Sequence, residues 1–318
     1  MNRRKTLLLL GAGAAALAAP WAQAQTVTRM LVGATPGGGT DIVARELALE
    51  LSRRLGRQFI VDNRPGAAGN IAAQAVAKSP PDGSTLLLSY TSHAINPSLY
   101  GKLPFDAVAD FTPLAGIASL PGILVARPDL PANDIKELIA LAKSKPGKLN
   151  IAIAGLGSSN HLASEVLKLD AGINITGVPY KGTGPALQDV LAGQIDLVIS
   201  GVASVQQLLR AGKVKALGVT SKRRLADFPE VPAIAEAVPG FDFSSWYGLF
   251  GPAGMQPAEA ARISAAAREA LGSPAMRERF KNEGLIAMGT GQEEFGRFVK
   301  SEIVRWGKIV QATGAKPE

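Results

Sequence analysis

Three glycine-containing segments of this 318-residue chain could bind an anion, because each separates a short apolar stretch from a helical pattern. The first, residues 33–40 (GATPGGGT), places three consecutive glycines directly before the first helical pattern. Glycine lets backbone N–H groups approach a ligand closely, and a helix N-terminus carries a partial positive charge. Both features suit a carboxylate or a phosphate. The alternative is a plain strand–helix turn in which Thr40 or Asp41 caps the helix.

The first segment departs from the two common nucleotide-binding motifs. Gly33 and Gly38 have the P-loop spacing, but Gly39 stands where the phosphate-binding lysine belongs. In the dinucleotide motif, Ile42 stands where the third glycine belongs. We therefore expect neither ATP nor NAD, and no other cofactor.

The second segment, residues 155–161 (GLGSSNH), brings serine and histidine together as a serine hydrolase would. The G-x-S-x-G pattern is not met, because His161 stands in place of the last glycine, and no pattern marks the acid of a triad. Ser158 or Ser159 as a helix cap and ligand contact is the favoured interpretation. The alternative is an exported hydrolase that uses one of these serines with His161, which could equally be a pocket residue or a packed core histidine.

The third segment, residues 180–184 (YKGTG), contains Lys181, which could place a cation beside a carboxylate. Thr91, Ser92 and Val202 also follow apolar, strand-like stretches. Ligands of α/β proteins bind at the carboxyl ends of strands, so five loops could converge on one cleft. The sequence contains little else that resembles a catalytic motif. Besides a binding protein and a hydrolase, a scaffold with a vestigial cleft is therefore a third possibility.

The composition excludes several classes of protein. Cysteine is absent, which rules out disulfides, iron–sulfur clusters and thiol nucleophiles, and two histidines, His93 and His161, leave little material for a metal site. The hydrophobic share of 47% and the charged share of 19% indicate a sizeable core, and the length suggests about two domains. Three of the eight net positive charges belong to Arg3, Arg4 and Lys5 near the N-terminus. The other charges form mixed-sign stretches without a basic run, so nucleic acid is not an expected partner.

Residues 1–24 have the features of a secretory signal peptide. Arg3, Arg4 and Lys5 precede an apolar stretch at residues 7–19, and the sequence Ala-Gln-Ala at 22–24 predicts cleavage before Gln25. The alternative is a membrane anchor, but the apolar stretch is shorter than the roughly 20 residues that span a bilayer. We expect export to the periplasm by the Sec or the twin-arginine route.

Strand and helix patterns alternate after residue 25 and predict an α/β fold with mostly parallel sheets flanked by helices. The predicted strands lie at 27–34, 59–61, 85–89, 149–154, 173–179, 195–200 and 214–220. The predicted helices between them lie at 43–55, 71–78, 134–144, 159–169, 185–191 and 204–211. The C-terminal third has one predicted strand at 246–250 and helices at 258–271, 274–282 and 293–313.

An ordered set of short motifs resembles the substrate-binding receptors of the tripartite tricarboxylate transporters, the Bug or TctC-like family. The motifs run in the family's order from residue 27 almost to the C-terminus. They are PGGGTDIVAR (36–45), NRPG (63–66), PDG (81–83), NPSLY (96–100), GSS (157–159), HLA (161–163), VPYKG (178–182), GQID (193–196) and WYG (246–248).

The resemblance implies a non-enzymatic periplasmic binding protein of the two-domain, Venus-flytrap kind that closes over a small organic carboxylate. It implies a first domain formed by residues 25–125 and 240–318 and a second formed by residues 126–239. It also implies a monomer whose partners are the ligand and the membrane subunits of a tripartite transporter, with no metal.

Carried over position by position, the resemblance predicts a set of ligand contacts in five loops. They are Thr35, Gly37, Gly38, Gly39, Thr40, Asp41, Thr91, Ser92, Ser158, Ser159, His161, Lys181 and Val202. Gly33 and Ala34 replace the Pro-Phe pair that family members usually carry, which predicts a roomier or differently shaped pocket. Backbone amides would contact only the carboxylate and not the rest of the ligand. Tricarboxylates, dicarboxylates, acidic amino acids, amides and aromatic acids therefore all stay candidate ligands.

Overall fold

The computed structural model describes residues 27–154 and 158–316. The predicted signal peptide lies outside these residues. Within them, no helix combines the length and the hydropathy needed to cross a membrane.

The first sheet has six strands in the order β11-β4-β10-β3-β1-β2. Strand β1 pairs in parallel with β2 and β3, whereas β10 runs antiparallel to β3 and β4, and β11 antiparallel to β4. The strands are β1 (Thr28–Val32), β2 (Phe59–Asn63), β3 (Thr85–Tyr90), β4 (Phe111–Leu120), β10 (Ser245–Pro252) and β11 (Ile286–Thr290).

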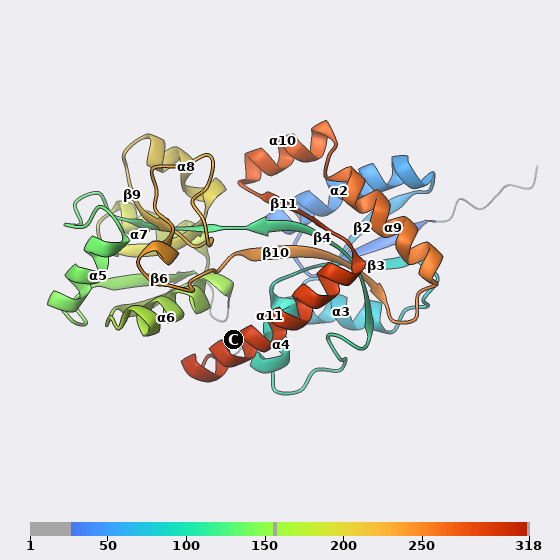
Figure 1. The fold of residues 1–318 in the computed structure, drawn as a ribbon, viewed down its shortest axis with the longest axis horizontal. Coiled ribbons are helices and arrows are strands. Elements are labelled where there is room, and N and C mark those ends of the chain that lie inside the picture. Colours follow the sequence, from blue (N-terminus) through green and yellow to red (C-terminus); the bar gives the residue numbers. More distant parts are fainter. Residues whose placement is uncertain (1–26, 155–157, 317–318) are drawn as a thin grey trace, which may run out of the picture.

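Two layers of helices cover this sheet, and Figure 1 shows one layer above it and one below. The upper layer is α2 (Gly39–Leu55), α9 (Pro257–Ala270) and α10 (Pro274–Glu283), and the lower layer is α3 (Asn70–Ala77), α4 (Ser92–Leu99) and α11 (Gln292–Thr313). In α2 the apolar residues recur every four positions, so Val43, Leu47 and Leu51 are fully buried against the sheet. Gly56 ends the helix with a left-handed φ of 64°.

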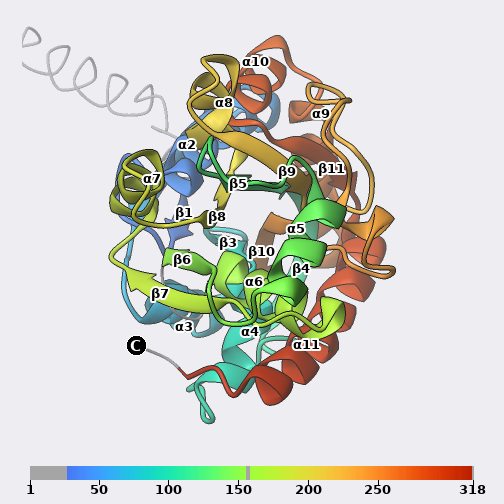
Figure 2. The ribbon, with the colours of Figure 1, turned by 90° about the vertical axis from the view of Figure 1, so that its left-hand side faces the viewer.

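The second sheet has five strands in the order β7-β6-β8-β5-β9. They are β5 (Gly122–Ala126), β6 (Asn150–Ala154), β7 (Thr176–Tyr180), β8 (Leu197–Gly201) and β9 (Lys215–Val219). Helices α5 (Ile135–Ser144) and α6 (Ser159–Ala171) lie on one face, and α7 (Thr183–Leu191) and α8 (Val202–Arg210) on the other (Figure 2). We call each sheet with its helices a lobe.

The chain passes between the lobes through strands rather than helices. Strand β4 ends at Leu120 in the first sheet and β5 begins at Gly122 in the second, so only Pro121 separates them. The chain returns between β9 and β10, through a segment that contains the short 3₁₀ helix η3 (Ile234–Glu236). The predicted two-domain α/β fold is confirmed, with two sheets that take their strands from different parts of the chain.

The expectation of mostly parallel sheets is wrong, because both sheets are mixed. Among the strands of the described residues, four pairings are parallel and five are antiparallel. The antiparallel pairings all involve β4, β5 or β10. No α-helix lies between β4 and β5 or between β9 and β10. A pattern of alternating strands and helices describes only the part of each sheet built from β–α–β units.

Candidate ligand-binding site

The strand directions bring the carboxyl ends of six strands to the region between the lobes. Because β10 runs antiparallel to both β3 and β4, the ends of β1, β2 and β3 lie on the side where β4 leaves for the second sheet. In the second sheet Gly122 pairs with Gly201, so β8 ends beside the start of β5, and β6 and β7 run parallel to β8. The ends of β1–β3 therefore face the ends of β6–β8 (Figures 1 and 2).

An α-helix follows each of these six strands in the chain after a short loop or at once, so six helix N-termini are directed at the same region. They belong to α2, α3 and α4 in the first lobe and to α6, α7 and α8 in the second. The N-caps of α2, α3, α7 and α8 are glycines, so in these four helices the N-cap residue provides no side-chain hydrogen bond to the first turn. Uncapped N–H groups and the helix dipole favour an anion here.

The buried side chain of Asp41 fixes the position of the first loop. Its carboxylate is 2% exposed and accepts hydrogen bonds from Gly37 N, Arg45 Nε and Asn63 Nδ2, each at 2.9 Å. Burial opposes ionisation of Asp41, but these three donors outweigh it and hold its pKa below the usual range. The N-cap of α2 is Gly38, so the interpretation that Thr40 or Asp41 caps this helix is wrong.

The other predicted residues of the first loop lie at its surface or just below it. Thr35, Gly37 and Gly39 are exposed, Gly38 is half-buried and Thr40 is buried. The backbone of this loop is therefore accessible, while the side chain of Asp41 fixes its position.

Thr91 and Ser92 follow β3 and have different surroundings. The Thr91 side chain is buried, and its Oγ1 accepts a hydrogen bond of 2.8 Å from Trp246 N on β10. Ser92 is partly exposed and forms a hydrogen bond with the Tyr90 side chain. Thr91 thus joins the residue after β3 to the start of β10, and Ser92 is the more exposed of the two.

The second segment lies at the start of α6. Ser158 is the N-cap, and its Oγ accepts a hydrogen bond of 3.2 Å from His161 N. Ser159 Oγ lies 2.5 Å from Ser245 Oγ at the start of β10, a hydrogen bond that joins the two lobes. These contacts fit the cap interpretation of the two serines; residues 155–157 of this segment lie outside the described part of the chain.

His161 is partly buried on the same helix, and its Nε2 lies 3.9 Å from Glu165 Oε1. Burial lowers the pKa of His161, although the nearby Glu165 carboxylate opposes this shift. Glu165 also forms an ion pair of 2.6 Å with Lys168. His161 is therefore predominantly neutral at neutral pH.

Lys181 and Val202 lie in different environments. Lys181 is exposed after β7. The preceding Tyr180 donates a hydrogen bond of 2.5 Å to Asp189 Oδ2, which raises the pKa of Tyr180 to about 12. Val202 is 6% exposed and packs against Gly284 at the end of α10, because a Cβ added to Gly284 would lie 2.7 Å from Val202 Cβ. Val202 thus takes part in a contact between the lobes.

The loop between β2 and α3 was not among the predicted site loops, although residues 63–66 belong to one of the quoted motifs. Ala67 and Ala68 have left-handed φ angles of 46° and 50°, in the short helix η2 (Ala67–Gly69). A Cβ on Gly33 would lie 2.5 Å from Gly69 Cα, so this loop packs directly on the end of β1. The pair of glycines around two alanines, between a strand and a helix, is the signal that could have identified it.

Tyr90 and Tyr247 are two further residues that the prediction did not include. They are partners in the register of β3 and β10. The Tyr247 hydroxyl would lie 3.2 Å from a Cβ on Gly39, and it forms a hydrogen bond with Thr40 at the start of α2. Both phenols therefore reach the glycine-rich loops from the sheet below.

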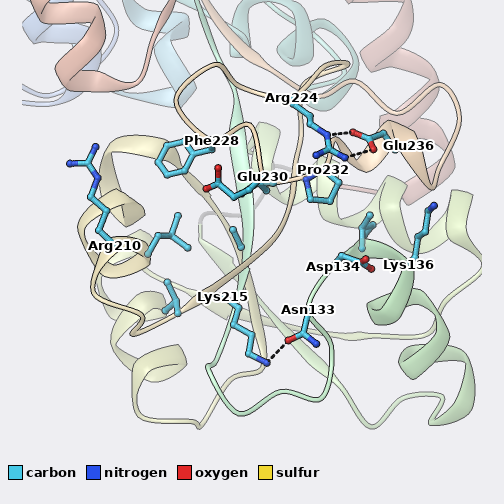
Figure 3. A pocket seen from close by; sticks show the side chains of 15 residues that line it. Asn133, Asp134, Lys136, Arg210, Lys215, Arg224, Phe228, Glu230, Pro232 and Glu236 are labelled. Atoms are coloured by element: carbon cyan, nitrogen blue, oxygen red, sulfur yellow. Dashed lines mark hydrogen bonds and ion pairs between the residues drawn. The ribbon is translucent and has the colours of Figure 1, made fainter.

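A cavity of about 740 Å³ lies elsewhere, on the outer side of the second lobe (Figure 3). It is lined by the start of α5, the end of α8, the start of β9 and residues 224–236. Lys215 in its wall pairs with Ala126, at the end of β5 far from the crossing between the lobes. Arg224 and Glu236 form an ion pair of 2.7 Å there. None of the predicted site residues lines this cavity.

In the described part of the chain, no three His, Cys, Asp or Glu side chains gather in a way that could hold a metal ion. The six strand ends offer backbone N–H groups, hydroxyls and one exposed lysine instead. This set of groups can bind an anion.

Comparison with known proteins identifies relatives along the whole chain. Residues 43–315 match the model of the tripartite tricarboxylate transporter family receptors. Protein BugT of Bordetella pertussis is 36% identical over 324 residues, which cover 99% of each protein.

Three solved structures have the same fold. The periplasmic binding protein BugD superposes with a TM-score of 0.75 at 32% identity, covering 92% of this chain and 99% of that one. R. palustris Rpa4515 with adipate gives a TM-score of 0.78 at 35% identity, covering 94% and 100%. MatC from Rhodopseudomonas palustris with bound malate gives 0.73 at 34% identity, covering 89% and 99%.

Proposed function

The chain belongs to the tripartite tricarboxylate transporter receptor family, and we propose that it is an exported receptor for a small organic carboxylate. It would capture this ligand between its two lobes and deliver it to a membrane transporter. Binding proteins of this family are periplasmic solute-binding receptors, which are not enzymes. For this chain we place the cleavage of the signal peptide before Gln25, within the residues that the structure does not describe.

The observation that carries the proposal is the convergence of six helix N-termini on the region between the lobes. A carboxylate placed there would accept hydrogen bonds from backbone N–H groups of the glycine loops and from hydroxyls such as those of Ser92 and Ser158. Charge-assisted hydrogen bonds of this kind contribute about 1.5–3 kcal/mol each. Two lobes that close on the ligand would remove these bonds from competition with water.

We retain the predicted domains, residues 25–125 with 240–318 and residues 126–239, as part of the proposal. The change of sheet between Leu120 and Gly122 supports a first crossing at Pro121, a few residues before the predicted boundary at residue 125. The segment between Val219 and Ser245 would contain the second crossing. Both crossings would bend when the lobes close.

Dicarboxylates are the first ligands to test, because relatives are named with adipate and with malate. The test is calorimetric titration of the mature protein with malate, succinate, adipate, citrate, glutamate and benzoate. We expect at least one to bind with one ligand per chain. If none of these acids binds or raises the melting temperature, the proposal fails.

A double variant tests the position of the ligand. Changing Ser158 and Ser159 to alanine should weaken binding of the best acid by about 10-fold or more, because it removes the cap of α6 and the hydroxyl contact with Ser245. The matched control changes Ser144 and Ser301, two exposed serines outside the strand ends, and should bind with unchanged affinity. Equal affinity in all three proteins would contradict this placement.

The hydrolase alternative has a direct test. The hydroxyls of Ser158 and Ser159 take part in a helix cap and in a bond with Ser245, which supports the receptor over the enzyme. We expect no labelling of the mature protein by a fluorophosphonate probe. Labelling of either serine would instead support an activated nucleophile.

A further inference from the structure

The Tyr90 hydroxyl lies where three loops of the first lobe meet. Tyr90 is the last residue of β3, and its side chain is only partly buried. Its hydroxyl lies 3.4 Å from Gly33 O at the end of β1 and would lie 3.2 Å from a Cβ on Gly69. It also forms a hydrogen bond with Ser92, directly after β3. One phenol thus contacts the ends of β1 and β3 and the loop before α3.

Close packing of two glycines fixes the position of this hydroxyl. A Cβ on Gly33 would lie 2.5 Å from Gly69 Cα, so the loop reaches β1 only because residue 33 lacks a side chain. Asn96 Nδ2 holds the same loop by donating to Ala68 O at 3.1 Å and to Asn70 Oδ1 at 2.7 Å. The space that a larger residue would occupy at position 33 is therefore filled by backbone.

The hydroxyl has hydrogen-bonding capacity to spare. An O–H···O bond is normally about 2.5–3.0 Å long, so the contact of 3.4 Å with Gly33 O is a weak one. Burial raises the pKa of Tyr90, and this outweighs the opposing hydrogen bond from Ser92. The phenol is therefore protonated at neutral pH and can donate to an oxygen of a ligand.

We propose that the Tyr90 hydroxyl donates a hydrogen bond to a second oxygen-bearing group of the ligand, so that the receptor prefers carboxylic acids with two polar ends over monocarboxylic acids of the same length. This inference rests on the proposed function, in which the helix N-termini bind the first carboxylate. An alkyl end placed against a partly buried hydroxyl would leave the hydroxyl without a good partner. Sites built around such a polar group discriminate strongly against ligands that lack its partner.

The test compares matched pairs of acids on three proteins. Calorimetric titration would measure adipate against hexanoate and succinate against butyrate on the wild type, on Tyr90→Phe and on Tyr100→Phe. We expect the wild type to prefer the diacid, and Tyr90→Phe to reduce that preference by about 10-fold through weaker diacid binding. Tyr100 lies at the C-terminal end of α4, so Tyr100→Phe should keep the wild-type preference.

The outcomes separate this inference from the function on which it rests. If the wild type binds diacids and Tyr90→Phe keeps the same ratio of affinities, the inference is overturned while the receptor function stands. If the wild type binds no carboxylate, both the proposed function and this inference are wrong. If it binds monoacids as tightly as diacids, the role of Tyr90 is wrong.

A second variant keeps the inference testable if Tyr90→Phe folds poorly. Gly33→Ala should push Gly69 away from Tyr90 and lower the preference for diacids several-fold, with the fold checked by circular dichroism. Gly272→Ala is the matched control, because Gly272 is exposed between α9 and α10. An unchanged preference in a folded Gly33→Ala protein would contradict the link between the glycine contact and selectivity.

Discussion

Asp41 and Thr91 are predicted ligand contacts whose side chains hold the loops on which they lie. Asp41 joins the first loop to Asn63 at the end of β2, and Thr91 joins β3 to Trp246 on β10. Both side chains are buried, so their effect on a ligand would be indirect. Residue type and position in a motif identify the loop that carries a site, but not which of its side chains face the ligand.

Asp41→Asn should destabilise the protein by about 1–3 kcal/mol at pH 7, because an amide cannot accept all three hydrogen bonds. The pKa of Asp41 is lowered in the folded state, so its stabilising contribution is present above the unfolded value of 3.8 and is lost as pH falls through the folded value. Urea denaturation at pH 7 and at pH 3 would measure this. Asp170→Asn, at an exposed carboxylate, is the control, and equal stability of both variants at pH 7 would contradict the role of Asp41.

His93 should make the protein less stable in mild acid. Burial among Phe105, Phe111 and Phe250 lowers its pKa from 6.5 to about 4, although its hydrogen bond to Ala107 O opposes this shift. Above pH 6.5 His93 is neutral in both the folded and the unfolded protein and does not lower the free energy of unfolding. As pH drops toward 4, its protonation in the unfolded state lowers the free energy of unfolding by up to about 3 kcal/mol. Denaturation curves from pH 7 to pH 4 should show a smaller loss for His93→Phe than for the wild type. An equal loss would contradict the assignment to His93.

Most strands and helices that follow one another as strand–loop–helix units could be predicted from the sequence. Strands that follow one another directly, or that lie at a sheet edge, could not. The predicted strands and helices correspond to β1–β3, β6–β10 and nine of the described helices, with ends shifted by a few residues. Helix α4, which contains Pro97 and is only eight residues long, was not predicted, and neither were the consecutive strands β4 and β5. Strand β11, a short strand at the sheet edge that contains Gly289, was not predicted either.

The loops of the candidate site could likewise be predicted only where they follow a strand–loop–helix pattern. Five of the six loops were predicted from their place after a strand, and the loop before α3 was not. Its contact with Gly33 joins segments 36 residues apart and depends on the absence of a side chain, which no local pattern reveals. Gly33 and Ala34 replace the usual Pro-Phe pair, which predicted either a roomier or a differently shaped pocket. Because Gly69 fills the space beside residue 33, the contact favours a pocket of different shape.

Gly284→Ala should weaken ligand binding by disturbing the contact between α10 and α8. Gly284 has a left-handed φ of 62°, and an added Cβ would lie 2.7 Å from Val202 Cβ in the other lobe. Gly172→Ala is a matched control, because Gly172 also ends a helix with a φ of 60° but has no atom within 4 Å of an added Cβ. Both variants should lose about 1–2 kcal/mol of stability from the backbone, and only Gly284→Ala should lose affinity by several-fold in calorimetry. Equal affinities would contradict the role of this contact in closure.

The molecule consists of two sheets, joined by two crossings of the chain, whose strand ends face each other. Contacts between the lobes include those of Ser159 with Ser245 and of Val202 with Gly284. A ligand held between the strand ends would be bound by both lobes at once and would link their positions. Binding would also stabilise the folded protein, by about 2.7 kcal/mol at a ligand concentration 100 times its Kd.

A carboxylate that binds between the lobes should contact the strand ends of both lobes. Hydrogen–deuterium exchange of the mature protein, with and without the tightest-binding acid of the panel, would detect this contact. We predict slower exchange in residues 35–41, 66–72, 91–93, 158–161 and 201–204, which belong to both lobes. Protection confined to the outer cavity around Phe228 and Lys215, or to one lobe alone, would contradict the account.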